Sequence, residues 1–500
     1  MSLRRVHSPA QALPLYGLTA TRALEAKALA RSAPGQLMRQ AGQSVARLAL
    51  ALAPHAQTIV VLCGPGNNGG DGLIAAAELH QSAANSGRRV LVILTHGAPK
   101  QGDAALAWAA AHSAGVQVIS DWPSQVDMVI DAVFGIGVHL PLGETTLGWL
   151  SAAQAAPVRL SVDAPSDLDC STGQALTEHH PHAQVRHTLS LLTLKPGLFT
   201  GHGRDLAGSV WWDDLGCADL PLTTPPDAWL APPALEAQRA HAMHKGSFGD
   251  VTVIGGQLPE AGRTGMLGAA VLASRAALHA GAGRVYLCTL GDAWPSIAPA
   301  QADLMLRTWA TLQHNPAQGV WLAGCGGGSA IAALMPHILQ HLDGLILDAD
   351  ALNAVAADVQ LQNALRTRKA LSVLTPHPLE AARLLGCATA QVQANRLLAA
   401  QALADRYQAV VVLKGSGTVI AAPALSPWVN PTGNARLAIA GTGDVLAGMV
   451  AARLARGDTK PTAQAQTAVA EAVWRHGHLA DQWPLSKPLT AQALANLSPG

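Results

Sequence analysis

Apolar residues follow two alternating patterns along this chain, short runs typical of buried strands and longer segments with helical spacing. In the first half, residues 58–63 (TIVVLC) and 89–94 (RVLVIL) predict strands, and residues 73–80 between them predict a helix. A strand, a glycine-rich turn, a helix and a second strand make a βαβ unit. Helical spacing predicts one or two helices over residues 20–53. Further strands are predicted at residues 128–133, 158–162 and 188–194.

The second half alternates in the same way with a different sequence. A helix is predicted at residues 268–280, and strands are predicted at residues 251–254, 284–289, 344–348 and 409–413. Between the halves, residues 221–233 hold five prolines and no periodic pattern. We therefore expect a first domain of residues 1–220, a linker of 221–240 and a second domain of 241–500. Both domains should be α/β, with a mostly parallel sheet covered on both faces.

Composition narrows the class of protein. Of the 500 residues, 49% are hydrophobic and 13% are charged, and the net charge is +1. This balance gives no electrostatic reason to expect nucleic acid or an anionic membrane as a partner. The six cysteines lack the spacing of metal ligands, no apolar h-region follows Arg4 and Arg5, and no run of about 18 uninterrupted apolar residues occurs in this sequence. We expect a soluble, cytoplasmic protein, and the low charge favours a homo-oligomer.

A glycine-rich tract, residues 64–72 (GPGNNGGDG), follows the first predicted strand, where open α/β sheets bind their ligands. The glycines let the backbone approach an anion, and Asn67 and Asn68 add side-chain amides. Two other strand ends carry carboxylates, Asp131 before a glycine turn and Asp163 before a proline. Either aspartate alone could be a helix cap. Together with the tract they predict one ligand-binding crevice.

These segments, together with residues 195–198 (KPGL), resemble the YjeF N-terminal family of NAD(P)H-hydrate epimerases over residues 15–220. The resemblance implies a Rossmann-like doubly wound sheet and a site for hydrated NADH and NADPH (NADHX and NADPHX). The implied substrate contacts are Asn67, Asn68, Gly69, Gly70, Asp71, Gly135, Ile136, Gly137, Val138, His139, Leu140, Pro141 and Asp163. The resemblance also implies a potassium ion on Asn68, Asp131 and Ser166, and oxygen donors suit such a hard cation.

Epimerisation at a carbon that bears a hydroxyl group and the ring nitrogen needs a group that handles a proton and stabilises positive charge. Asp163 is the candidate catalytic residue. Lys195 either orients this carboxylate or lies at the surface with only its stem buried. The chain departs from the family at Asp167, where a glycine is usual. This extra carboxylate either strengthens the cation site or misplaces the turn.

A second set of small residues follows the strand predicted at 409–413. It comprises residues 414–418 (KGSGT) and 441–444 (GTGD), the latter opening a helix predicted from residue 445. Backbone N–H groups and the positive end of a helix suit a phosphate there, and Asp444 can act as a base. His377 lies between two prolines that fix its position, which favours a ligand contact over a purely structural role.

This half resembles the YjeF C-terminal, ribokinase-like family of ADP-dependent NAD(P)H-hydrate dehydratases over residues 240–485. The implied contacts with the hydrate are Ala269, Gly327, His377 and Asp444. The implied contacts with ADP are Lys414, Gly415, Ser416, Gly417, Thr418 and Gly443. Phosphorylation would turn the hydroxyl group into a leaving group, with Asp444 as the base and Mg2+ neutralising the phosphoryl group. Asp348 and Asp350 are candidates for holding the metal or a water molecule. Cys325 stands where the family often has a proline.

The two resemblances together imply repair of a damaged cofactor. The first half would interconvert the R and S hydrates, and the second would dehydrate the S form to NAD(P)H, with ADP giving AMP and phosphate. The order of the halves favours ADP over ATP. The alternatives are a small-molecule kinase of the ribokinase type and a non-enzymatic nucleotide sensor. His179, His180 and His182 are interpreted as part of a solvated loop and not as a metal site.

Overall fold

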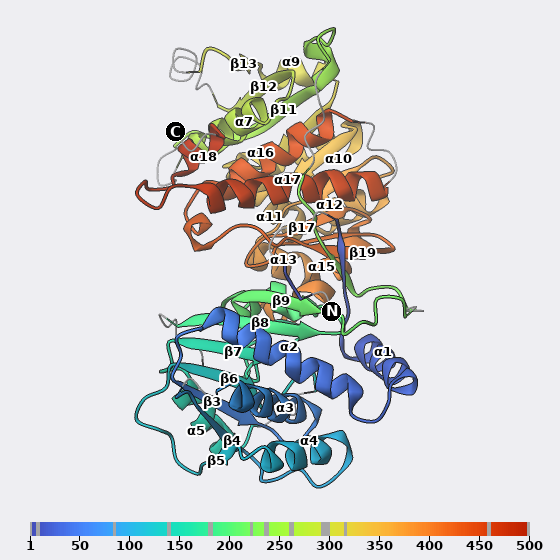
Figure 1. Ribbon diagram of the computed structural model, residues 1–500. Helices are drawn as coiled ribbons and strands as arrows, with labels where there is room; N and C mark the ends of the chain where they lie inside the picture. Colours follow the sequence, from blue (N-terminus) through green and yellow to red (C-terminus); the bar gives the residue numbers. More distant parts are fainter. Residues whose placement is uncertain are drawn as a thin grey trace. The chain divides into compact units, whose positions relative to one another are not determined.

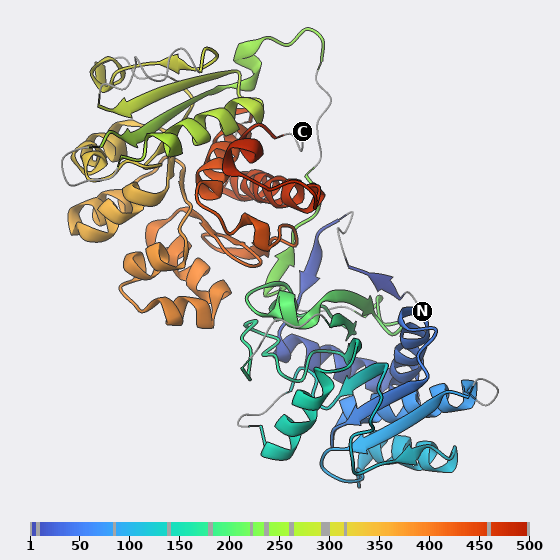
Figure 2. The ribbon, with the colours of Figure 1, turned by 90° about the vertical axis from the view of Figure 1, so that its left-hand side faces the viewer.

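The structure is a computed structural model that describes residues 3–6, 11–83, 87–137, 142–178, 184–220, 224–234, 240–259, 265–291, 301–314, 318–457 and 462–497. The chain divides into two compact units. The first comprises Met1–His7 with Leu13–Ala228, and the second comprises Ser8–Ala12 with Trp229–Gly500. In Figures 1 and 2 the first unit runs from blue to green and the second from green to red.

The first unit is built on a sheet in the order β1-β9-β8-β7-β6-β3-β4-β5, parallel throughout except for β1. The strands of the unit are β1 (Arg4–Arg5), β2 (Leu13–Leu15), β3 (Thr58–Cys63), β4 (Arg89–Leu94), β5 (Gln117–Val118), β6 (Met128–Ala132), β7 (Val158–Val162), β8 (Val185–Leu191) and β9 (Ser209–Asp213). Its helices are α1 (Leu18–Arg31), α2 (Gln36–Leu52), α3 (Asn67–Ser82), α4 (Gly102–Ser113), α5 (Glu144–Ala153), η1 (Pro196–Phe199) and α6 (Gly203–Ala207).

Both faces of this sheet are covered. Ile59, Val61 and Cys63 of β3 pack in a core cluster with apolar residues of α1 to α4. The alternate residues Val60 and Leu62 pack in a second cluster with residues of α5. Successive side chains of a strand point to opposite faces, so an unbroken apolar run such as 58–63 belongs in the centre of a doubly covered sheet. Figure 1 shows α2 and α3 along one of these faces.

The second unit is built on a sheet that includes the order β13-β12-β11-β14-β15-β16-β17-β18-β19-β10, in which β18 is antiparallel to both neighbours. The strands are β10 (Ala228–Leu230), β11 (Asp250–Gln257), β12 (Arg284–Leu290), β13 (Met305–Leu306), β14 (Val320–Ala323), β15 (Gly344–Leu347), β16 (Ser372–Leu374), β17 (Val410–Leu413), β18 (Val419–Ala422) and β19 (Leu425–Val429).

Helices cover both faces of this sheet as well. One core cluster includes residues of α7, α16, α17 and α18, and another includes residues of α10 to α15. The helices are η2 (Lys245–Phe248), α7 (Leu267–His279), α9 (Trp309–His314), η3 (Ala330–Leu334), α10 (Met335–His341), α11 (Ala349–Ala357), α12 (Val359–Thr367), α13 (Pro378–Leu385), α14 (Thr389–Ala394), α15 (Arg396–Tyr407), η4 (Ala435–Leu437), α16 (Thr442–Ala455), α17 (Thr462–Gln482) and α18 (Ala491–Ala495). Within the described residues, no helix has the length and apolarity needed to cross a membrane.

Each sheet contains a point where the strand order reverses. In the first unit the chain runs outward from β3 to β4 and β5, then returns to the other side of β3 with β6. In the second unit it runs from β11 to β12 and β13, then returns with β14. Ligands of open α/β sheets bind beyond the carboxyl ends of strands at such switch points. The α/β class with mainly parallel sheets, predicted for both halves, is confirmed.

Two helices begin earlier than predicted. The helix expected from residue 73 begins at Asn67, and the helix expected from residue 445 begins at Thr442. Glycines lower helix propensity, but here they permit close packing. A Cβ on Gly69 would lie 2.0 Å from the carbonyl oxygen of Gly64, and one on Gly72 would lie 2.5 Å from the Cβ of Ala132.

Candidate active sites

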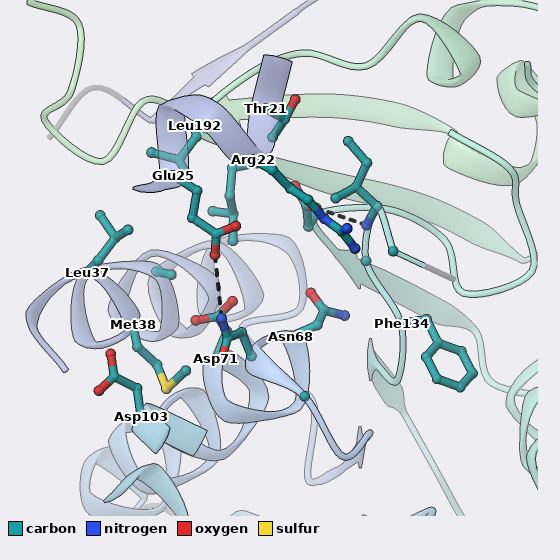
Figure 3. A pocket seen from close by; sticks show the side chains of 18 of the residues that line it. Thr21, Arg22, Glu25, Leu37, Met38, Asn68, Asp71, Asp103, Phe134 and Leu192 are labelled. Carbon is teal, nitrogen blue, oxygen red and sulfur yellow. Dashed lines mark hydrogen bonds between the residues drawn. The ribbon is translucent and has the colours of Figure 1, made fainter. Parts of the chain in front are cut away.

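A cavity of about 420 Å³ lies beyond the carboxyl ends of β3 and β6, at the switch point of the first unit. Figure 3 shows side chains from α1, α2 and the start of α3 around it. Of the predicted substrate contacts, Asn67, Asn68, Asp71, Gly135, Ile136, Gly137 and Asp163 line this cavity. The structure therefore brings together three segments that are far apart in the sequence. Val138, His139, Leu140 and Pro141 lie outside the described residues.

Gly69 and Gly70 are not among the lining residues. Both are buried in α3, and a Cβ on Gly70 would lie 2.6 Å from the side chain of Met38. Their small size therefore serves helix packing. A ligand contact through their backbone stays a prediction. Gly64 has a similar role at the end of β3, because a Cβ there would lie 1.9 Å from the carbonyl oxygen of Val133.

Asp163 is held in a fixed position at the end of β7. Its φ of 65° is in the left-handed region, which is costly for a residue other than glycine and occurs most often at functional sites. One carboxylate oxygen, Oδ1, accepts the N–H of Leu191 at 3.1 Å, and Oδ2 accepts the N–H of Ile136 at 3.3 Å. Lys195 donates to Oδ1 as well. The carboxylate thus joins the β6–α5 loop to the end of β8.

Lys195 is fully buried, so the alternative that placed it at the surface is wrong. Its Nζ also donates to the carbonyl oxygen of Leu191 at 2.8 Å and to Oγ of Ser190 at 3.2 Å. An ammonium group has three donors, and all three are used. Lysine is almost never fully buried unless it is paired, and each of the three N–H donors of Lys195 has a partner here. The carboxylate of Asp163 is its charge partner.

A second carboxylate, that of Asp71, lines the same cavity. Burial raises the pKa of Asp71 well above its usual range, and the nearby carboxylates of Asp163 and Glu25 raise it further. A carboxyl group with a raised pKa and a lysine-paired carboxylate therefore face one cavity. When the surroundings of two carboxyl groups move their pKa values apart, one group suits the role of acid and the other that of base.

Of the three predicted potassium ligands, Asn68 is among the residues that line the cavity, and Asp131 and Ser166 are not. The buried Nδ2 of Asn68 has no hydrogen-bond partner within the part of the chain that the structure describes. Asp131 and Ser166 are buried and bond to each other, with 2.5 Å between Ser166 Oγ and Asp131 Oδ1. A guanidinium group that sequence reasoning missed, that of Arg159, lies 2.6 Å from Asp131 Oδ2. The signal was an arginine inside a strand of a doubly covered sheet, where a charge requires buried partners.

In the second unit, three strand ends and a helix start converge. Lys414, after β17, lies 2.8 Å from Oδ1 of Asp348, after β15. Cys325, after β14, is buried, and its Sγ lies 3.6 Å from Oδ2 of Asp348. Ligand atoms of Cys325, Asp348 and Asp444 all lie within 4.8 Å of one another. Burial raises the pKa of Asp444 to about 6, and the charge of Asp348 contributes in the same direction.

The predicted nucleotide contacts lie around this cluster. A Cβ on Gly443 would be in ordinary contact with Nζ of Lys414, at 3.4 Å. Thr418 closes the loop after β17, with its Oγ1 donating to the carbonyl oxygen of Gly415 at 3.1 Å. Gly415 and Ser416 are exposed at the start of this loop, and Gly417 is buried. The loop therefore presents backbone to solvent beside a lysine, as a phosphate site requires.

The predicted hydrate contacts are more dispersed. Ala269 is buried in α7, and Gly327 is in the glycine loop after β14, where its N–H donates to the carbonyl oxygen of Gly324 at 3.0 Å. His377 caps α13, since its Nδ1 accepts the N–H of Leu379 at 3.1 Å. Among the described residues, Asp350 is not part of the cluster of Cys325, Asp348 and Asp444, and its carboxylate accepts the N–H of Gly328 at 2.8 Å. The structure thus gives His377 and Asp350 structural roles, and the ligand contact predicted for His377 stays a prediction.

Comparisons with known proteins agree with this division of the chain. A family model described as YjeF-related protein N-terminus matches residues 34–197, and one described as NAD(P)H-hydrate dehydratase matches residues 251–499. The bifunctional NAD(P)H-hydrate repair enzyme Nnr of Escherichia coli (strain K12) is 34% identical over 445 residues, which cover 84% of this chain and 80% of the relative.

Two further relatives match the second unit. The ADP-dependent (S)-NAD(P)H-hydrate dehydratase of Neisseria meningitidis serogroup B is 41% identical over 262 residues, covering 51% of this chain and 84% of the relative. The crystal structure of ADP/ATP-dependent NAD(P)H-hydrate dehydratase from Bacillus subtilis, co-crystallised with ATP and Mg2+, is 30% identical and covers 53% of this chain and 92% of that chain, with a TM-score of 0.44. The two family resemblances found in the sequence are confirmed, and this chain belongs to the family of bifunctional NAD(P)H-hydrate repair enzymes.

Proposed function

We propose that this protein repairs hydrated nicotinamide dinucleotides with two separate sites. The first unit interconverts the R and S forms of NADHX and NADPHX. The second unit dehydrates the S form to NAD(P)H while ADP is converted to AMP and phosphate. The observation that carries the proposal, beside family membership, is a carboxylate with an altered environment at the switch point of each unit, Asp163 with Asp71 in one and Asp444 in the other.

In the first unit the two carboxyl groups divide the proton chemistry. Asp71, in its protonated form, gives its proton to the hydroxyl oxygen of the hydrate, and the C–O bond breaks as water leaves. The ring nitrogen supplies the electron pair that forms an iminium ion, and the carboxylate of Asp163 stabilises its positive charge. Water then adds to the other face of the ring and returns a proton to Asp71. The reaction consumes and produces one water molecule, so atoms and charges balance.

The potassium ion implied by the sequence resemblance does not fit the residues around Asp131. The carboxylate of Asp131 already accepts hydrogen bonds from Ser166 at both oxygens and from Arg159. A hard cation needs oxygen ligands with free lone pairs. No step of the proposed epimerisation therefore uses a bound cation.

In the second unit, Asp444 takes the proton of the substrate hydroxyl group. The oxygen then attacks the β-phosphorus of ADP, and AMP leaves. Loss of a ring proton and of phosphate restores the nicotinamide double bond. Lys414 stabilises charge on the phosphoryl oxygens, together with the positive end of α16, where Gly443 lies beside Lys414.

The residues of this site fit a magnesium ion that is bound together with the nucleotide. Asp348 and Asp444 offer carboxylate oxygens close together, whereas the neighbouring Cys325 is a poor ligand for a hard cation. Mg2+ is usually held by one or two carboxylates together with substrate phosphates and water. When bound, it would neutralise charge on the phosphoryl group being transferred.

The test uses a mixture of R and S NADHX with ADP and Mg2+, followed by NADH absorbance and by chromatography of the two hydrates. The natural chain should convert the whole mixture faster than spontaneous epimerisation permits. Asp163→Asn should convert the S fraction rapidly and leave the R fraction. Asp444→Asn should form no NADH but still interconvert the hydrates. The proposal is overturned if either variant repairs both forms at the rate of the natural chain.

A further inference from the structure

A buried positive charge lies behind the pocket of the first unit. Arg159, in β7, is fully buried, and its guanidinium group bridges two carboxylates. Its Nη2 lies 2.6 Å from Oδ2 of Asp131 and 3.0 Å from Oδ1 of Asp167. Its Nη1 donates to the other oxygen of Asp167 at 3.2 Å. The contact with Asp167 is therefore bidentate, the strongest arrangement available to these groups.

The oxygens of Asp131 are engaged by these partners and by the turn after β7. Oδ1 accepts the Oγ of Ser166 at 2.5 Å and the N–H of Val133 at 3.4 Å. Oδ2 accepts the backbone N–H of Ser166 at 3.0 Å and the guanidinium group of Arg159. A carboxylate has about four lone-pair sites, so this set of donors leaves none free.

A second guanidinium group adds to the positive charge. Arg186 of β8 is the cross-strand neighbour of Arg159 in the parallel ladder, and it is also buried. The charge of Arg186 acts on Arg159, and the carboxylates of Asp167 and Asp205 act on Arg186. A monovalent cation added at Asp131 would meet the guanidinium group of Arg159 at the same carboxylate, and in a site of low dielectric constant that repulsion is strong.

The cluster connects directly to the pocket. Ser166, oriented by Asp131, accepts the N–H of Phe134 at 2.8 Å. Phe134 lines the cavity and precedes the turn of Gly135 and Ile136. A charge that fixes Asp131 therefore also fixes the loop that contacts Asp163 through the N–H of Ile136.

We propose that Arg159, paired with Asp167, supplies from within the chain the positive charge that a potassium ion would otherwise provide at Asp131, so the epimerase site works without a monovalent cation. This inference rests on the proposed epimerase function. It also accounts for the departure at residue 167, because an aspartate in place of the usual glycine is what allows an arginine to be buried at residue 159.

The experiment compares the purified full chain in potassium, sodium and choline chloride at equal ionic strength. Two quantities are measured, the rate of hydrate epimerisation and the midpoint of thermal unfolding. We expect epimerisation rates within about twofold of each other and no stabilisation specific to potassium. A drop of tenfold or more without potassium, or a rise in unfolding temperature that potassium alone produces, overturns the inference.

A double variant tests the role of the arginine. Arg159→Leu with Asp167→Gly removes one charge of each sign and should create a potassium requirement of at least tenfold in epimerisation, together with potassium-specific thermal stabilisation. Arg89→Leu, at an exposed arginine of β4 in the same sheet, is the control and should remain insensitive to the cation. A double variant that folds and stays insensitive argues against the inference.

The thermal measurement needs no turnover, so it decides the cation question even if the double variant is inactive. If the double variant does not fold, the salt comparison on the natural chain decides alone. Absence of epimerisation in every salt, with S-hydrate dehydration intact, refutes the proposed epimerase function and leaves the thermal result to judge the cation site.

Discussion

Replacement of Lys195 by methionine probes the centre of the first site. Methionine has a similar length but no charge, so the change removes the three hydrogen bonds of Nζ and leaves the carboxylate of Asp163 without its charge partner. The side chains of Lys195 and Asp163 are 0% and 14% exposed. Breaking one side of a buried ion pair costs about 3–5 kcal/mol. We expect the lower end, about 3 kcal/mol, because Asp163 keeps two backbone N–H donors and some contact with water.

Hydrogen exchange, resolved by peptide, can measure this loss of stability within the first unit. A single unfolding curve cannot, because unfolding of a chain with two units is not two-state. Exchange of β7 and β8 amides should accelerate by about two orders of magnitude, and epimerisation should fall by at least tenfold. The double variant with Asp163→Asn should recover part of the stability, since no unpaired charge remains, but none of the activity. Lys100→Met, at an exposed lysine, is the control. Protection within 1 kcal/mol of the natural chain in Lys195→Met would refute this account of the ion pair.

Three other predictions follow from single groups. Burial raises the pKa of Asp444 to about 6, and the carboxylate is the form that acts as the base. The value of kcat/KM for dehydration should therefore fall about tenfold per pH unit below pH 6 and level off above it. A flat profile between pH 5 and 7 would contradict this role. The hydrogen bond from the Cys325 thiol lowers the pKa of Asp444, so Cys325→Ala should move that acidic limb to higher pH, and a move to lower pH would count against the contact. Gly64→Ala places a methyl group 1.9 Å from the carbonyl oxygen of Val133 and should lower the stability of the first unit by about 2 kcal/mol or more, measured as faster hydrogen exchange of β3 amides. Gly66→Ala, where a Cβ meets nothing within 4 Å, should cost much less.

The sequence predicted the fold best where the pattern of residues has a single physical explanation. The apolar run within residues 58–63 predicted a strand covered on both faces, and the structure places it next to the switch point. Asp131 and Asp163, at the ends of neighbouring strands, were expected in one crevice. The structure places Asp163 in the lining of the cavity, whereas Asp131 is buried against Ser166 and Arg159. Helix starts were less predictable, because the glycines of α3 are tolerated through contacts that only the tertiary structure reveals.

Charged residues with buried partners were the hardest to predict. Nothing local distinguishes Lys195 from a surface lysine, since its partners Asp163 and Ser190 come from other segments of the fold. The ion pair of Arg159 with Asp167 spans eight positions and a strand end, so neither residue alone indicates it. For His377 the structure adds a role that the sequence did not indicate, because its Nδ1 caps α13, while the ligand contact predicted from its neighbouring prolines stays a prediction.

The reversal of strand order in the first sheet also determines when its site can exist. Asn68 is made early in synthesis, whereas Lys195, which secures Asp163, is made nearly 130 positions later, and both must meet at the same strand ends. A nascent or truncated chain that stops before β8 therefore has the glycine tract but no anchored carboxylate. The first unit should therefore bind the hydrate only after the whole unit has folded. A bound hydrate would in turn stabilise contacts between segments from both ends of the unit.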